Sequence, residues 1–119
     1  MKTVFFVEDD ESLQDIALLV FREPEFAVNI FSSAEELLDE RTYPHVYVLD
    51  KRLPGIDGLE LCRILKSDPQ TRPIPIIMVS ADPDIKALAA SAGAEAVLEK
   101  PFSIHVLVKA VMNVSTQIS

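Results

Sequence analysis

The chain has 119 residues, of which 49% are hydrophobic and 25% are charged, and its formal net charge is −8. This length predicts one domain, spanning 1–119, with a single core. The acidic charge argues against nucleic acid as a direct ligand, because phosphate backbones are bound by patches of lysine and arginine. No apolar run is long enough to cross a membrane, and no signal peptide is recognisable, so we expect a cytoplasmic protein without membrane contact. The single cysteine, Cys62, excludes an internal disulfide, which fits a reducing compartment.

Short apolar segments alternate with amphipathic segments along the chain. The apolar segments are rich in β-branched residues and bounded by turn residues, which is typical of buried strands. Apolar residues at intervals of three and four predict a helix after each strand. A βα series of this kind predicts a parallel sheet covered by helices on both faces. The five predicted strands are residues 3–7, 27–31, 46–49, 76–79 and 96–98.

Two helix starts carry capping signals. Ser12 precedes the first amphipathic segment and is a candidate N-cap of that helix, while Asp10 is expected to lie on the rim of the site or to cap the same helix. Ser33 with Glu36 three residues later forms a predicted capping box for the second helix. We expect Leu37 and Leu38 to form the buried side of the second helix.

Reactive side chains follow four of the five predicted strands. Right-handed crossovers place the carboxyl ends of all parallel strands at one edge of the sheet, where open α/β folds bind their ligands. We therefore expect these side chains to converge there. They are Glu8 and Asp9 after the first strand, Asp50 after the third, Ser80 after the fourth and Lys100 after the fifth.

The chemistry of this set favours a cation and a phosphoryl group. Carboxylates close together repel one another and are costly to bury unpaired. A Mg²⁺ ion bound by one or two carboxylates and by water would resolve this, and no histidine lies near enough to favour zinc. Lys100 and Ser80 could hold phosphoryl oxygens, and Asp50 is the candidate nucleophile for an acyl phosphate. No Gly-rich phosphate loop follows the first strand, which argues against a nucleotide hydrolase.

Four motifs in this order resemble the receiver domains of two-component response regulators. The resemblance covers essentially the whole chain. The motifs are Val7-Glu8-Asp9-Asp10, Asp50-x-x-Leu53-Pro54-Gly55-x-Asp57-Gly58, Ser80-Ala81 and Lys100-Pro101-Phe102.

The resemblance implies a fold and a set of residue roles. The fold would be a flavodoxin-like three-layer (βα)5 domain with a parallel sheet in the order 2-1-3-4-5. Asp50 would accept a phosphoryl group from a phosphohistidine. Mg²⁺ would be bound directly by Asp9, Asp50 and the backbone carbonyl of Arg52, with Glu8 acting through water. Ser80 and Lys100 would contact the phosphoryl oxygens.

The resemblance also implies partners and a conformational switch. The phosphoryl donor would be a sensor histidine kinase or a phosphotransfer protein, and the signal would pass to a downstream effector or a fused output domain. Dimerisation through the last two helices is common in the family. Such a module catalyses its own modification and is not an enzyme with a turnover substrate. The Lys100–Pro101 bond is expected to be cis, as it usually is in receivers.

Two features depart from the family pattern or refine it. Val97 stands at the switch position, where receivers usually have Tyr or Phe, so we expect the usual aromatic gate to be absent. Arg52 and Asp82 occupy positions that flank the attacking water in receivers, and we expect their opposite charges to pair across the mouth of the site. Lys51 is expected to be solvated.

Two alternative functions remain open at this point. One is a degenerate receiver that acts only as a protein-interaction module. The other is a small Mg²⁺-dependent phosphohydrolase, although such an enzyme would need a D-x-D motif after the first strand, and Glu8-Asp9-Asp10 does not supply one.

Overall fold

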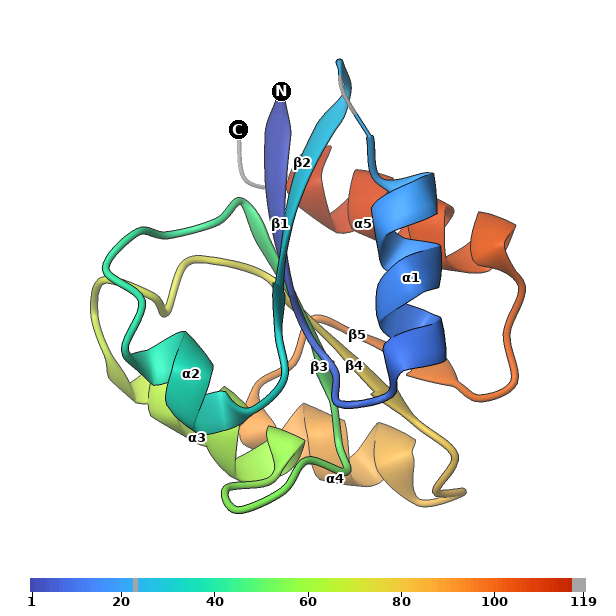
Figure 1. The fold of residues 1–119 in the computed structure, drawn as a ribbon. Coiled ribbons are helices and arrows are strands. Elements are labelled where there is room, and N and C mark those ends of the chain that lie inside the picture. The colour runs from blue at the N-terminus through green and yellow to red at the C-terminus, as the bar shows by residue number, and fades with distance from the viewer. Residues whose placement is uncertain (23, 117–119) are drawn as a thin grey trace.

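The computed structural model describes residues 1–22 and 24–116 and contains an alternating series of strands and helices (Figure 1). Each strand predicted from the sequence is present and is one residue longer at one end than predicted. The elements are β1 (Lys2–Val7), α1 (Glu11–Val20), β2 (Phe26–Phe31), α2 (Ala34–Leu38), β3 (Val46–Asp50), α3 (Gly58–Ser67), β4 (Ile76–Ser80), α4 (Ile85–Ala92), β5 (Ala96–Glu99) and α5 (Ile104–Thr116).

All strand pairs are parallel, and the sheet order is β2-β1-β3-β4-β5. The flavodoxin-like three-layer order implied by the family resemblance is therefore confirmed. Helices α1 and α5 cover one face of the sheet, and α2, α3 and α4 cover the other (Figure 1). The carboxyl ends of all five strands consequently lie at one edge.

The central strands β3 and β4 are buried along their whole length. Successive side chains point to opposite faces of a strand, so each strand contributes to two cores. Tyr47 and Leu49 pack with the core under α2, α3 and α4, whereas Val46 and Val48 pack with the core under α1 and α5. This double burial explains why these strands read as unbroken apolar runs rather than as alternating ones.

Of the two candidate caps of α1, the structure has Asp10. Asp10, not Ser12, is the N-cap, and its Oδ1 atom accepts a hydrogen bond of 2.8 Å from the backbone N–H of Ser12. The helix begins one residue before Ser12, which leaves that residue inside the first turn. An aspartate at this position also places a negative charge at the positive end of the helix dipole.

The second helix follows its predicted cap but not its predicted buried face. The Ser33 hydroxyl accepts from the Glu36 N–H at 3.1 Å, while Glu36 accepts from the backbone N–H of Ser32 instead of closing the box on Ser33. Leu37 is 4% exposed but Leu38 is 41% exposed. Adjacent helical residues point about 100° apart, so a helix of only five residues turns one leucine to the core and the other to solvent.

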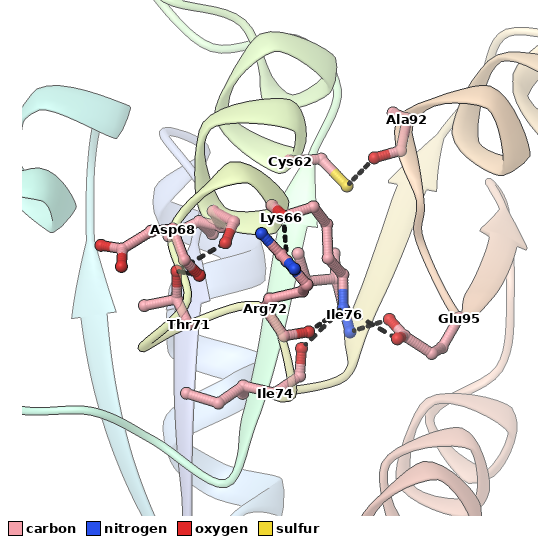
Figure 2. Close-up of polar contacts among 10 residues, drawn as sticks. Cys62, Lys66, Asp68, Thr71, Arg72, Ile74, Ile76, Ala92 and Glu95 are labelled. Carbon is pink, nitrogen blue, oxygen red and sulfur yellow. Dashed lines mark hydrogen bonds and ion pairs between the residues drawn. The ribbon is translucent and has the colours of Figure 1, made fainter.

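A polar network fixes the sheet edge opposite to the carboxyl ends (Figure 2). The Lys66 ammonium donates to the carbonyls of Arg72 and Ile74, at 3.0 Å each, and pairs with Glu95 at 2.8 Å. The other Glu95 oxygen accepts from the Ile76 N–H. Cys62, fully buried on α3, donates to the Ala92 carbonyl, and burial raises the pKa of its thiol to about 11. These bonds connect α3, the loop before β4, and the turn before β5.

The last helix, α5, continues to the end of the described part of the chain. It extends to Thr116, and Ser115 is buried, with its carbonyl accepting from the Lys2 ammonium at 3.2 Å. The final residues, 117–119, lie outside the described part of the chain. No described helix is long and apolar enough to cross a membrane.

Candidate functional site

The structure brings the predicted reactive side chains together around one open cleft of about 750 Å³ at the carboxyl edge of the sheet. Asp50 and Ser80 are the last residues of β3 and β4, and the remaining groups directly follow β1 and β5. The lining residues are Glu8, Asp9, Asp10, Asp50, Arg52, Ser80, Ala81, Asp82, Pro83 and Lys100.

The loop after Asp50 is folded tightly beneath this cleft. The Gly58 N–H donates to the Lys51 carbonyl at 2.8 Å, and a Cβ atom at Gly58 would overlap the backbone carbonyl of Asp50. Leu53 is buried in the core, and the Asp57 carboxylate caps α3 by accepting from the Glu60 N–H. Leu53, Asp57 and Gly58 of the motif therefore each have a structural role, and together they position Asp50.

Lys100 provides a positive charge between two buried carboxylates. Its Nζ atom lies 3.2 Å from Asp50 Oδ2 and 3.6 Å from Glu8 Oε1. Glu8 is 1% exposed and Asp50 is 5% exposed. Burial raises the pKa of Glu8 to about 8, reinforced by the hydrogen bond and the negative charge of Asp50, while Lys100 acts in the opposite direction. One lysine thus leaves an excess of negative charge in this part of the cleft.

The carboxylates of Glu8, Asp9 and Asp50 fit a hard divalent cation. Each offers an oxygen, and these oxygens lie within 4.8 Å of one another. The oxygen-only donor set and the open cleft, which leaves room for water ligands, match the preferences of Mg²⁺. Arg52 lines the same cleft, and its backbone N–H donates to Asp50 Oδ1 at 3.3 Å.

Ser80 is 2% exposed and is held by backbone on both sides. Its hydroxyl accepts from the Asp82 N–H at 2.9 Å, and its carbonyl accepts from the Lys100 N–H at 2.8 Å. The Lys100–Pro101 peptide bond is cis. The hydroxyl and the ammonium group therefore reach the cleft from adjacent strands that are fixed to each other.

The prediction that Arg52 pairs with Asp82 is wrong. Asp82 Oδ2 accepts instead from the ammonium of Lys51, whose side chain is only 20% exposed and is not solvated as expected. This hydrogen bond, followed by one from the Asp84 N–H, lowers the pKa of Asp82. The sequence gives no signal for choosing between two adjacent basic residues, because the choice depends on side-chain direction at the end of β3.

Val97 lies in β5, half-buried, and packs against the core under α2, α3 and α4. No aromatic ring occupies this position. The nearest aromatic in sequence, Phe102, packs against the opposite core. The four residues of β5 include no aromatic side chain.

This fold and this cleft define a receiver domain. The sequence pattern of the family described as "Response regulator receiver domain" matches residues 4–112, and the chain belongs to this family.

The relatives include transcriptional regulators. The chain is 32% identical over 104 residues to the transcriptional regulatory protein CreB of Escherichia coli (strain K12), covering 86% of this chain and 45% of CreB. It is 36% identical over 111 residues to CseB of Streptomyces coelicolor, covering 88% and 45%. The chain therefore spans about half the length of these curated relatives.

Solved receiver structures share the fold. A putative response regulator from Chloroflexus aurantiacus superposes with a TM-score of 0.89 at 35% identity, covering 97% of this chain and 98% of that chain. The receiver domain of the sensor histidine kinase PA1611 from Pseudomonas aeruginosa superposes with a TM-score of 0.86 at 23% identity, covering 97% and 98%. That structure has a magnesium ion coordinated in its active-site cleft.

Proposed function

We propose that this receiver domain accepts a phosphoryl group onto Asp50 from a phosphohistidine of a partner protein, in a reaction that requires Mg²⁺. The observation that carries the proposal is the position of Asp50. Asp50 is 5% exposed, and its carboxylate lies 3.2 Å from the Lys100 ammonium and shares one cleft with the carboxylates of Glu8 and Asp9 and with the Ser80 hydroxyl.

The side chains divide the work of this transfer. A carboxylate oxygen of Asp50 attacks phosphorus, the P–N bond to the donor imidazole breaks, and the imidazole nitrogen leaves and takes up a proton from solvent. Lys100 and the Ser80 hydroxyl hold phosphoryl oxygens of the product. This reaction depends mostly on positioning and charge neutralisation, and the Lys100–Asp50 contact already supplies part of both.

The metal would complete the neutralisation of charge. Glu8, Asp9, Asp50 and the backbone carbonyl of Arg52 would hold Mg²⁺, which when bound offsets negative charge on the carboxylates and on the phosphoryl oxygens. The pKa of Glu8 is raised first by burial and further by the hydrogen bond and negative charge of Asp50, and a cation bound beside these groups would favour the ionised form of Glu8. The PA1611 receiver supports this assignment by similarity of fold, since its cleft holds magnesium.

Partners and location follow from the same proposal. The donor would be a sensor histidine kinase or phosphotransfer protein in the cytoplasm. The modified domain would change the face it presents to an effector, to a fused output domain or to a second copy of itself. A fused output domain is suggested by relatives such as CreB, of which this chain covers only 45%. His45 is a poor internal donor, because it directly precedes β3, at the opposite edge of the sheet from Asp50, and accepts from the Thr3 N–H at 2.8 Å.

Acetyl phosphate, a small phosphoryl donor, provides the test. The intact chain incubated with acetyl phosphate and Mg²⁺ should gain the mass of one phosphoryl group, and Asp50→Asn should abolish this gain. Asp15→Asn, which removes an exposed carboxylate from α1 outside the cleft, is the matched control and should be modified like the parent. Modification that persists in Asp50→Asn would contradict the proposal. No modification of the parent chain would instead leave the degenerate, interaction-only receiver.

A further inference from the structure

The Lys51–Asp82 ion pair connects two loops at the mouth of the cleft. Lys51 directly follows Asp50, and Asp82 lies two residues after Ser80. The two side chains are only 20% and 24% exposed, and Asp82 is part of the cleft lining. Ion pairs that water only partly reaches are screened less than exposed ones. This pair is therefore a stronger constraint than an ordinary surface contact.

Asp82 is the residue through which the loop between β4 and α4 is held. Its N–H donates to the Ser80 hydroxyl at 2.9 Å, and its Oδ1 atom accepts from the Asp84 N–H at 2.9 Å. Its carbonyl accepts from the Ile85 N–H at 3.1 Å, at the start of α4. A force on the Asp82 side chain is thus transmitted both to the Ser80 hydroxyl and to the first turn of α4.

We propose that Lys51 and Asp82 are positioning residues that hold the unphosphorylated conformation, keeping the Ser80 hydroxyl on the Asp82 N–H and the start of α4 in place until charge appears on Asp50. This inference rests on the proposed function, because it assigns a regulatory role to residues beside the phosphoryl acceptor.

Phosphorylation would weaken this pair through charge alone. A phosphoryl group adds about two negative charges to the residue next to Lys51. That charge attracts the Lys51 ammonium away from Asp82 and repels the Asp82 carboxylate. A local charge change of this kind can bias an element that has two arrangements. It also offers a route to α4 that does not require an aromatic residue at Val97.

Two substitutions separate this role from a simple effect of nearby charge. Lys51→Met removes a positive charge beside Asp50, so local electrostatics alone would weaken binding of an anionic phosphoryl mimic. Asp82→Asn removes a negative charge but keeps an oxygen that can accept from the Asp84 N–H. If the ion pair restrains the loop, either substitution alone breaks the pair and releases the loop. Adding the other substitution then causes no further release, so the effects of the two substitutions on binding are not independent.

The measurement is binding of beryllofluoride with Mg²⁺ to the parent chain, both single variants and the double variant. We compare the change in beryllofluoride affinity caused by Lys51→Met in two backgrounds, the parent chain and Asp82→Asn. We expect this change to be about fivefold more favourable in the parent, which is at the low end of typical coupling between sites. Lys51→Arg keeps the positive charge and should retain the parent affinity. Lys86→Met, which removes a 78% exposed lysine from α4, is the matched control and should also be unchanged.

Hydrogen exchange in the absence of metal and beryllofluoride gives an independent readout. The amides of Asp82, Asp84 and Ile85 should exchange several-fold faster in both single variants, because the hydrogen bond of each amide is made by Asp82, which the ion pair restrains. Unchanged exchange, or substitutions whose effects on binding are simply multiplicative, would overturn the proposal while leaving phosphoryl acceptance intact. A parent chain that binds no beryllofluoride would instead overturn the proposed function, and this inference with it.

Discussion

At Gly58 the first turn of α3 runs against the backbone of Asp50, and a Cβ atom there would overlap the Asp50 carbonyl oxygen and crowd the adjoining Lys51 backbone. Because backbone atoms cannot rotate away, Gly58→Ala must displace the end of β3. We expect a loss of about 2–3 kcal/mol in the free energy of unfolding and about tenfold slower modification by acetyl phosphate. Urea denaturation and the rate of mass gain would measure the two effects.

Gly55, in the same loop, is the control. It has a φ of +72°, so an alanine there is strained by about 1–2 kcal/mol, but the atoms its Cβ would meet belong to the exposed side chain of Glu35, which can rotate. Gly55→Ala should therefore cost less stability than Gly58→Ala and should leave the acetyl phosphate rate much closer to that of the parent. Equal effects of the two substitutions would show that the contact at Gly58 is not what positions Asp50.

The sequence was a reliable guide to which residues enter the cleft, and a poor guide to which of them pair. A residue that ends a parallel strand must lie at the carboxyl edge, so the convergence of Asp50, Ser80 and Lys100 follows from topology alone. The partner of Asp82 depends on side-chain rotamers, and Lys51 and Arg52 are equivalent in charge. The same limit applied to the cap of α1, where two suitable residues lie two positions apart.

Among the elements, α3 is held to its neighbours by Lys66 (Figure 2). Its side chain is 14% exposed, and its ammonium is bonded to two backbone carbonyls and to Glu95. Lys66→Met keeps most of the apolar stem but leaves these acceptors without the donor. We expect the free energy of unfolding to fall by about 2 kcal/mol, the scale of hydrogen bonds to a charged group. Urea denaturation would measure this loss.

Lys109→Met on α5 is the matched control, because it removes an exposed lysine that has no hydrogen bond or ion pair with the described residues of the chain. Its stability should stay within about 0.5 kcal/mol of the parent, as for most surface substitutions. If Lys66→Met lost as little stability as Lys109→Met, the bonds of Lys66 would not be what holds the loop before β4 in place.

The kinds of element were predictable, but their exact limits and faces were not. Apolar runs bounded by turn residues identified every strand, because burial on both faces leaves few other patterns. Leu38 was misassigned, since a helix of five residues is too short for periodicity to distinguish its faces. The bonds of Lys66 to the loop before β4 could not be predicted, because a lysine near a helix end is usually solvated.

For the molecule as a whole, βα alternation predicted a parallel sheet covered on both faces but not the order of its strands. Several orders satisfy right-handed crossovers. The order β2-β1-β3-β4-β5 was available only through the family resemblance, and the structure has it. This order places β1 directly beside β3. The carboxylates of Glu8 and Asp9, which follow β1, therefore lie close to that of Asp50 at the end of β3.

The formal net charge of −8 makes these clustered carboxylates a cost to the folded state that a cation should remove. Mg²⁺ at a hundred times its Kd should raise the free energy of unfolding by about 2.7 kcal/mol, since it binds the folded chain and not the unfolded one. Urea denaturation with and without Mg²⁺ would measure this. Sodium chloride at matched ionic strength should reproduce little of the gain, because screening does not replace direct ligands.

Asp9→Asn should be at least as stable as the parent without metal, because it relieves repulsion, yet should lose most of the response to Mg²⁺. A full response in Asp9→Asn would mean that the cation is held elsewhere.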